Sequence, residues 1–292
     1  MSPSEHDVSL ADGRTLRVLE DGDPRGRAIF FLHGSPGSRL LYDRQVKAAH
    51  RHHIRLVGYD RPGYGGSTPN PGRRMIDEAA HVAAIADALG IDRFAVGGHS
   101  GGGPPTLACA AVLPKRVVAA VSLASPAPYP AEGLDYLAGM GELNVADWNL
   151  MMSDQPAWEA KTAEETAMML NATPDQVKAF MSSLLSPVDL AAMTDEVSDF
   201  LLRQVRMGLR AGSAGARDDG LASAKPWGFD LSSIRVPLQL WHGGQDRFVP
   251  FAHGEWLAAH VPRVDAHLER EEGHISLFQK YPTVLEWMAD RF

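Results

Sequence analysis

The sequence contains a single cysteine, Cys109, among its 292 residues. One cysteine cannot form a disulfide within its own chain, so we expect a reducing compartment and a cytoplasmic location. Cys109 lies in an apolar segment, where a thiol is far more often a buried packing group than a nucleophile. We therefore expect a structural role for it.

Long apolar runs and basic clusters are also missing. No stretch approaches the ~20 apolar residues that a membrane-spanning helix needs. Lys and Arg number 28 against 36 Asp and Glu, which gives a formal net charge of −8, and no basic run stands out. These features argue against nucleic-acid and membrane partners. Residues 1–12 lack a basic segment followed by an apolar one, so we expect no signal peptide.

The remaining composition is typical of a globular protein, with 45% hydrophobic and 22% charged residues. Short apolar or alternating runs are separated by helical patterns over most of the chain. Strands that alternate with helices predict a largely parallel sheet with helices on both faces. The predicted strands are residues 8–10, 15–19, 28–32, 54–59, 94–96, 117–123, 236–241 and 264–268.

This alternation stops after Pro126 and returns near residue 226. Between them the sequence predicts helices, including one that begins at Thr173–Gln176 and one over Asp195–Leu209. We expect residues 1–126 and 226–292 to form the core, and residues 127–225 to form an inserted helical cap, or lid. Near the end of the cap, residues 212–215 predict a flexible stop, and residues 217–219 predict a solvated loop, with a part in positioning the lid as the alternative.

Methionine is concentrated in the predicted cap, which holds eight of the eleven. Methionine fills irregular gaps and suits adaptable apolar binding surfaces. We expect most of the eight to pack the interior of the cap and a few to line a pocket. They are Met140, Met151, Met152, Met168, Met169, Met181, Met193 and Met207.

A glycine-rich turn, residues 98–102, follows the predicted strand 94–96 and precedes an apolar helix. Its pattern, Gly98-x-Ser100-x-Gly102, is typical of a sharp strand-to-helix turn that exposes a serine hydroxyl. The serine backbone is strained there, and side chains two residues to either side would collide, so glycine is needed. The alternative is a glycine-rich turn in which the serine occurs by chance.

A serine hydroxyl becomes a good nucleophile when a base removes its proton and a third group orients that base. Asp246 and His274 follow the last two predicted strands. Because parallel strands end at the same edge of a sheet, these side chains should lie near Ser100. We predict Ser100 as nucleophile, His274 as base and Asp246 as acid, since residues 122–126 offer no rival carboxylate.

Over nearly its whole length the sequence resembles the α/β-hydrolase superfamily, and within it serine hydrolases of the carboxylesterase type with a helical lid. The resemblance implies an eight-stranded, mostly parallel sheet with helices on both faces and a lid between the sixth and seventh strands. It also implies that the backbone N–H groups of Ser35 and Gly101 form an oxyanion hole. The matching motifs are residues 33–37, 60–67, 98–102, 242–246 and 273–274.

The other histidines are expected to be structural. The family pattern gives His33 a role in shaping the loop of Ser35. We expect His99 to pack beside the serine and His242 to support the loop of Asp246. Residues 50–53 predict a solvated helix end rather than a metal site, because no carboxylate or cysteine joins their histidines at ligand spacing.

The expected activity is hydrolysis of a small to medium, mostly apolar ester or lactone through an acyl-enzyme at Ser100. We expect no metal or organic cofactor, a small-molecule substrate, and a monomer or homodimer. Ser100 disfavours the superfamily members that use an aspartate nucleophile. Three alternatives stay open: a carbon–carbon bond hydrolase with the same triad, a non-catalytic small-molecule binder, and a prolyl-aminopeptidase-like enzyme, which usually carries Trp where Gly101 stands.

Overall fold

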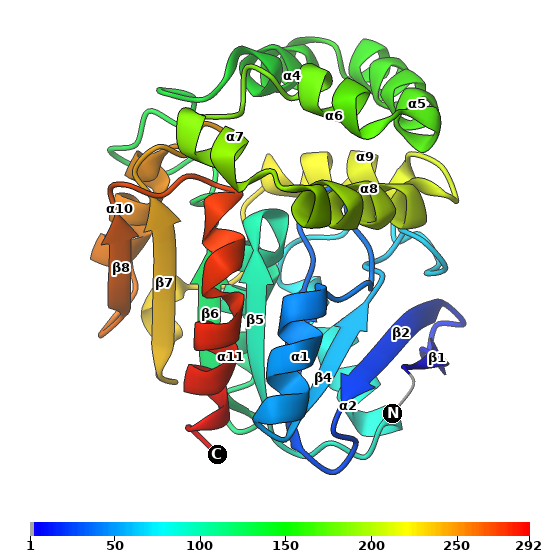
Figure 1. Cartoon of the computed structure of the whole chain (residues 1–292), viewed down its shortest axis with the longest axis vertical. Helices are drawn as coiled ribbons and strands as arrows, with labels where there is room; N and C mark the ends of the chain where they lie inside the picture. The colour runs from blue at the N-terminus through cyan, green and yellow to red at the C-terminus, as the bar shows by residue number, and fades with distance from the viewer. Residues whose placement is uncertain (1–2) are drawn as a thin grey trace.

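The computed structural model describes residues 3–292, which contain one eight-stranded sheet (Figure 1). The strand order is β1-β2-β4-β3-β5-β6-β7-β8, and only the pairs β1–β2 and β2–β4 are antiparallel. The predicted fold class, a mostly parallel α/β-hydrolase sheet, is confirmed. The strands are β1 (Ser4–Ser9), β2 (Thr15–Gly22), β3 (Arg27–Leu32), β4 (Ile54–Tyr59), β5 (Phe94–His99), β6 (Val117–Leu123), β7 (Leu238–Gly243) and β8 (Asp265–Glu269).

Helices cover both faces of the sheet, so β5, β6 and β7 are buried along their whole lengths. One face packs against α1 (Asp43–Arg51) and α11 (Tyr281–Ala289). The other packs against α2 (Asp77–Ala88), α3 (Gly103–Val112) and α10 (Phe251–His260). Cys109 of α3 is fully buried in this second core, and burial raises the pKa of its thiol. Its environment is that of a packing group.

Between β6 and β7 the chain forms six further helices, which we call the inserted helices. In Figure 1 they lie across the upper edge of the sheet, with α8 and α9 nearest the strands and α4, α5 and α6 above them. They are α4 (Glu142–Ser153), α5 (Gln155–Asn171), α6 (Pro174–Phe180), α7 (Pro187–Ala192), α8 (Asp195–Leu209) and α9 (Ala214–Ser223).

The inserted helices match two sequence predictions and depart from two. The predicted helix start at residues 173–176 is the capping box of α6, and α8 has the predicted bounds. A stop follows α8 as predicted, with Gly212 at a φ of +107°, but its predicted bounds are wrong, because α9 begins inside them at Ala214. The predicted solvated loop at residues 217–219 is also wrong, since it lies within α9 and Asp218 and Asp219 are buried. Within residues 3–292, no helix combines the length and apolar character needed to cross a bilayer.

The methionines of this segment divide between packing and surface. Met151, Met169 and Met193 are buried, and Met169 packs in a small cluster with Tyr64 of the core. Met152 and Met168 are instead exposed, at 51% and 44%. Of the eight methionines, three are buried, three are half-buried and two are exposed, so packing accounts for only part of the methionine content.

Candidate active site

Ser100 occupies a strained turn between β5 and α3. Its φ is +55°, a left-handed conformation that serine rarely adopts. A Cβ at Gly98 would overlap the carbonyl of Gly102, and a Cβ at Gly102 would overlap the carbonyl of Leu32. Ser100 and Gly101 are half-buried, whereas His99 and Gly102 are buried. The turn thus leaves the serine partly accessible, as its glycine pattern predicts.

Asp246 and His274 follow β7 and β8, and the structure brings them together. His274 Nδ1 donates to Asp246 Oδ2 at 2.7 Å, and both side chains are buried. The other carboxylate oxygen accepts from the backbone N–H groups of Phe248 and Val249, each at 2.8 Å. Because Nδ1 carries the donated proton, Nε2 of His274 is left as an acceptor.

The loop of Asp246 is also held by His242, as expected. His242 Nε2 donates to the carbonyl of Val249 at 2.8 Å. Burial lowers the pKa of this imidazole, so it stays neutral and acts as a fixed donor. The orientation of Asp246 is therefore set by two backbone N–H groups of its own loop, and His242 holds that loop at Val249.

His274 lies beside the serine turn. Its ring meets the ring of His99 edge-on, with centroids 4.8 Å apart, and stacks on Phe248 at 4.5 Å. Among the hydrogen bonds of residues 3–292, none joins the Ser100 hydroxyl to His274. Burial lowers the pKa of His99, and neither of its ring nitrogens has a partner among the described residues, so this ring packs against His274.

The loop of Ser35 lies against the turn that carries Ser100. A Cβ at Gly101 would lie 3.2 Å from the backbone nitrogen of Ser35, and a Cβ at Gly34 would lie 3.8 Å from Ser100 Oγ. The backbones of Ser35 and Gly101 are thus adjacent to each other and to the Ser100 hydroxyl. The structure therefore brings together the two residues whose N–H groups are predicted to form the oxyanion hole.

His33 holds this loop in place. Its Nε2 accepts from the backbone N–H of Arg61 at 3.1 Å, so its Nδ1 carries the proton and donates to the Gly34 carbonyl at 2.7 Å. Burial lowers the pKa of His33 to about 3. The imidazole is neutral at ordinary pH, and its role is to fix the loop, as the family pattern implies.

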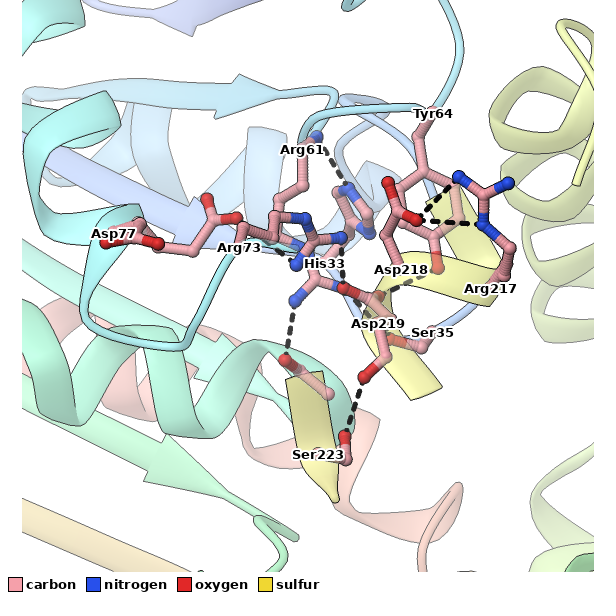
Figure 2. Close-up of polar contacts among 12 residues, drawn as sticks. His33, Ser35, Arg61, Tyr64, Arg73, Asp77, Arg217, Asp218, Asp219 and Ser223 are labelled. Carbon is pink, nitrogen blue, oxygen red and sulfur yellow. Dashed lines mark hydrogen bonds and ion pairs between the residues drawn. The ribbon is translucent and has the colours of Figure 1, made fainter. Parts of the chain in front are cut away.

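Sequence reasoning missed a buried ionic cluster next to Ser35 (Figure 2). Asp219 of α9 accepts from Arg61 and Arg73, each at 2.6 Å, and from the Tyr64 hydroxyl at 2.8 Å. Burial opposes ionisation of Asp219, but the two guanidinium groups outweigh it and hold the pKa of this carboxyl below its ordinary value. The carboxylate is therefore a permanent negative charge within the fold.

Two surface hollows lie along the segment that follows β6, one against α4 and the other against α10 and residues 226–232. Their volumes are about 370 and 650 Å³, and both are lined by Tyr129 and Pro130. Neither is lined by Ser100, Asp246 or His274. The hollows are separate from the three residues predicted to carry the chemistry.

Comparisons with known proteins identify the family. A family model described as alpha/beta hydrolase fold matches residues 27–281. A 2-hydroxy-6-oxononadienedioate/2-hydroxy-6-oxononatrienedioate hydrolase of Burkholderia vietnamiensis is 29% identical, over 91% of this chain and 87% of its own. A non-heme chloroperoxidase of Streptomyces lividans is 28% identical, over 91% of each chain.

A solved thermophilic esterase of Thermogutta terrifontis superposes with a TM-score of 0.70, covering 100% of this chain and 99% of its own at 18% identity. At that identity the likeness speaks for the fold alone. The predicted enzyme class, an α/β-fold hydrolase, agrees with the relatives and with the family model. From the match over residues 27–281 and the sheet order, the chain belongs to the α/β-hydrolase fold family.

Proposed function

We propose that this protein is a serine hydrolase that cleaves a carboxylic ester or lactone through an acyl-enzyme at Ser100. Ser100 Oγ bonds to the substrate carbonyl carbon while its proton passes to His274 Nε2. The carbonyl oxygen becomes an oxyanion, which the N–H groups of Ser35 and Gly101 stabilise. The tetrahedral intermediate then collapses, and the leaving alkoxide takes the proton from His274.

Deacylation repeats these steps with water as the nucleophile. His274 Nε2 removes a proton from water, the hydroxide bonds to the acyl carbon, and Ser100 regains its proton as the acid is released. Asp246 keeps the imidazole in the tautomer that both half-reactions need. The inserted helices act as the cap over this site.

One observation carries the proposal: the 2.7 Å hydrogen bond from His274 Nδ1 to Asp246, with the same imidazole next to the Ser100 turn. This bond leaves Nε2 free to accept a proton. The adjacent backbones of Ser35 and Gly101 support the same chemistry, because both could donate to one developing negative charge.

The test is hydrolysis of p-nitrophenyl esters of increasing acyl length by the wild type, Ser100→Ala and His274→Ala. We expect wild-type turnover that falls by a factor of about 10³ or more in both variants. Activity that survives in Ser100→Ala would contradict the acyl-enzyme. A ligand that raises the melting temperature equally in wild type and Ser100→Ala, without turnover, would support a binding protein instead.

A carbon–carbon bond hydrolase is the second candidate. The relative from Burkholderia vietnamiensis is named for a 2-hydroxy-6-oxo dienedioate substrate. In that reaction the group released from the acyl carbon is a carbanion equivalent rather than an alkoxide. Faster turnover of a 2-hydroxy-6-oxo dienoate than of every ester in the series, abolished in His274→Ala, would favour this candidate.

A further inference from the structure

We propose that Asp219 is a positioning residue for the oxyanion hole, and that it acts on Ser35 directly and on Gly101 through Arg61. This inference rests on the proposed function, because it assigns the two backbone N–H groups to the oxyanion. In this arrangement a carboxylate of the inserted helices orients backbone groups that belong to the core.

The direct link is a hydrogen bond between side chains. The Ser35 hydroxyl donates to Asp219 Oδ2. The peptide N–H of Ser35 is separated from that hydroxyl by two carbon atoms, so anchoring the side chain restricts rotation of the peptide. Ser35 is exposed, so its hydroxyl is held by hydrogen bonds to Asp219 and Arg61 rather than by burial.

The indirect link passes through one guanidinium group. Arg61 Nη2 donates to Asp219 Oδ2 at 2.6 Å and to Ser35 Oγ at 2.8 Å, while Nη1 donates to the Gly101 carbonyl at 2.6 Å. A planar guanidinium holds its donors in fixed directions. The Gly101 peptide is therefore tied to Ser35 by Arg61, and Arg61 is tied to Asp219.

Buried charge makes this arrangement rigid. The side chains of Arg61, Arg73 and Asp219 are 1%, 0% and 6% exposed. A buried ion pair is costly to break, since each charge would be left unpaired in a low-dielectric interior. Asp219 cannot leave the cluster without displacing Arg61, so the distance between the two oxyanion donors is held constant.

Asp218 provides a matched control on the same helix. It is also buried, but both of its hydrogen bonds come from Arg217, away from the Ser35 side of the cluster (Figure 2). Asp218→Asn and Asp219→Asn make the same change in charge and volume at adjacent positions. Only the second removes a contact to the oxyanion loop.

The experiment compares three quantities for wild type, Asp219→Asn, Ser35→Ala and Asp218→Asn. These are kcat and KM for a p-nitrophenyl ester, and the inhibition constant of an alkyl trifluoromethyl ketone. The ketone accepts Ser100 Oγ at its carbonyl carbon and forms a tetrahedral oxyanion, so its affinity reports on the oxyanion hole. A purely structural role would not move kcat and this constant together while KM stays fixed.

We expect Asp219→Asn to lower kcat and ketone affinity in parallel by a factor of about 10–100, with KM within about threefold of wild type. Ser35→Ala keeps the backbone N–H and should show the same pattern at about tenfold. Asp218→Asn should keep kcat within about twofold. The effects of Ser35→Ala and Asp219→Asn should be less than additive, because they break the same link.

Ser35→Ala decides the question if Asp219→Asn fails to fold, because it leaves every ion pair in place. The positioning role would be overturned if both variants lose thermal stability but keep the kcat and the ketone affinity of the wild type. A wild type that neither hydrolyses the esters nor binds the ketone would overturn the proposed function, and this inference with it.

Discussion

Asp189 Oδ1 accepts a hydrogen bond of 2.7 Å from the backbone N–H of Ile275, the residue that follows His274. The same oxygen accepts from the N–H of Ser276 at 3.1 Å, and the Ser186 hydroxyl donates to the other oxygen at 2.9 Å. Asp189 lies on α7 and is fully buried. The inserted helices therefore hold the loop of the predicted base as well as the loop of Ser35.

Replacing Asp189 by alanine should lower both stability and activity. The N–H groups of Ile275 and Ser276 would be buried without an acceptor, at a cost of about 1–3 kcal/mol each. We expect urea unfolding to show a loss of about 2–4 kcal/mol, and kcat on an ester to fall by about tenfold or more. Asp199→Ala on the surface of α8 is the control, since its partner Arg203 is exposed. A loss of stability without any change in kcat would argue against positioning of His274.

Strain at Ser100 predicts an unusual order of stability. Glycine normally destabilises a protein relative to alanine, but a φ of +55° costs alanine about 1 kcal/mol that glycine avoids. We expect Ser100→Gly to unfold at higher urea concentration than Ser100→Ala. At Ser122, in the buried strand β6, the opposite order should hold. If alanine is the more stable replacement at position 100 as well as at position 122, the turn is relaxed in solution.

Buried neutral histidines predict acid sensitivity. The pKa values of His33 and His253 fall from 6.5 to about 3 and about 4 because burial disfavours the charged ring. The unfolded chain therefore binds more protons, and the stability that these groups provide above pH 6.5 is lost as pH falls toward 4. Near pH 5 the two together give a slope of about 2 kcal/mol per pH unit.

The slope can be measured by urea unfolding between pH 6.5 and 5. His253 accepts from the N–H of Ala127 at 3.1 Å and donates to the carbonyl of Tyr136 at 2.9 Å, and a glutamine amide can supply both functions. We expect His253→Gln to reduce the slope by about 1 kcal/mol per pH unit. An unchanged slope would show that His253 takes up its proton in the folded state.

Contact between α8 and the Ser35 loop can be tested at a glycine. A Cβ at Gly208 would overlap the carbonyl of Gly37, and the Gly208 carbonyl accepts from the N–H of Gly65 at 2.7 Å. We expect Gly208→Ala to lower the melting temperature and also kcat. A lowered melting temperature with the kcat of the wild type would contradict the coupling.

Local patterns explain what could be predicted from the sequence. The buried strands are continuous apolar runs, the Ser100 turn needs glycines at fixed offsets, and α6 carries its own capping box. Each of these signals lies within a few residues of the structure that it specifies. The positions of Asp246 and His274 followed from strand order, because parallel strands end at one edge.

The cluster around Asp219 has no such local signal. Asp219 lies 184 residues from Ser35 and 158 from Arg61, so no spacing rule connects them. Residues 217–219 are three successive charged residues, a composition typical of a solvated loop. Tertiary pairing overrides that preference, because Arg61 and Arg73 need a buried anion. The contact of Asp189 could not be predicted for the same reason, because Asp189 lies 86 residues before Ile275 in the sequence.

The ion pairs of Asp219 limit how this scaffold can be recombined. Exchanging residues 127–225 for the corresponding segment of another enzyme is an attractive way to change specificity, because the three predicted catalytic side chains all stay behind. In this protein the exchange would also remove the carboxylate that neutralises Arg61. A chimera would need an acidic residue at the same point of its incoming segment, or it would leave an uncompensated cation bonded to Gly101, next to the predicted nucleophile.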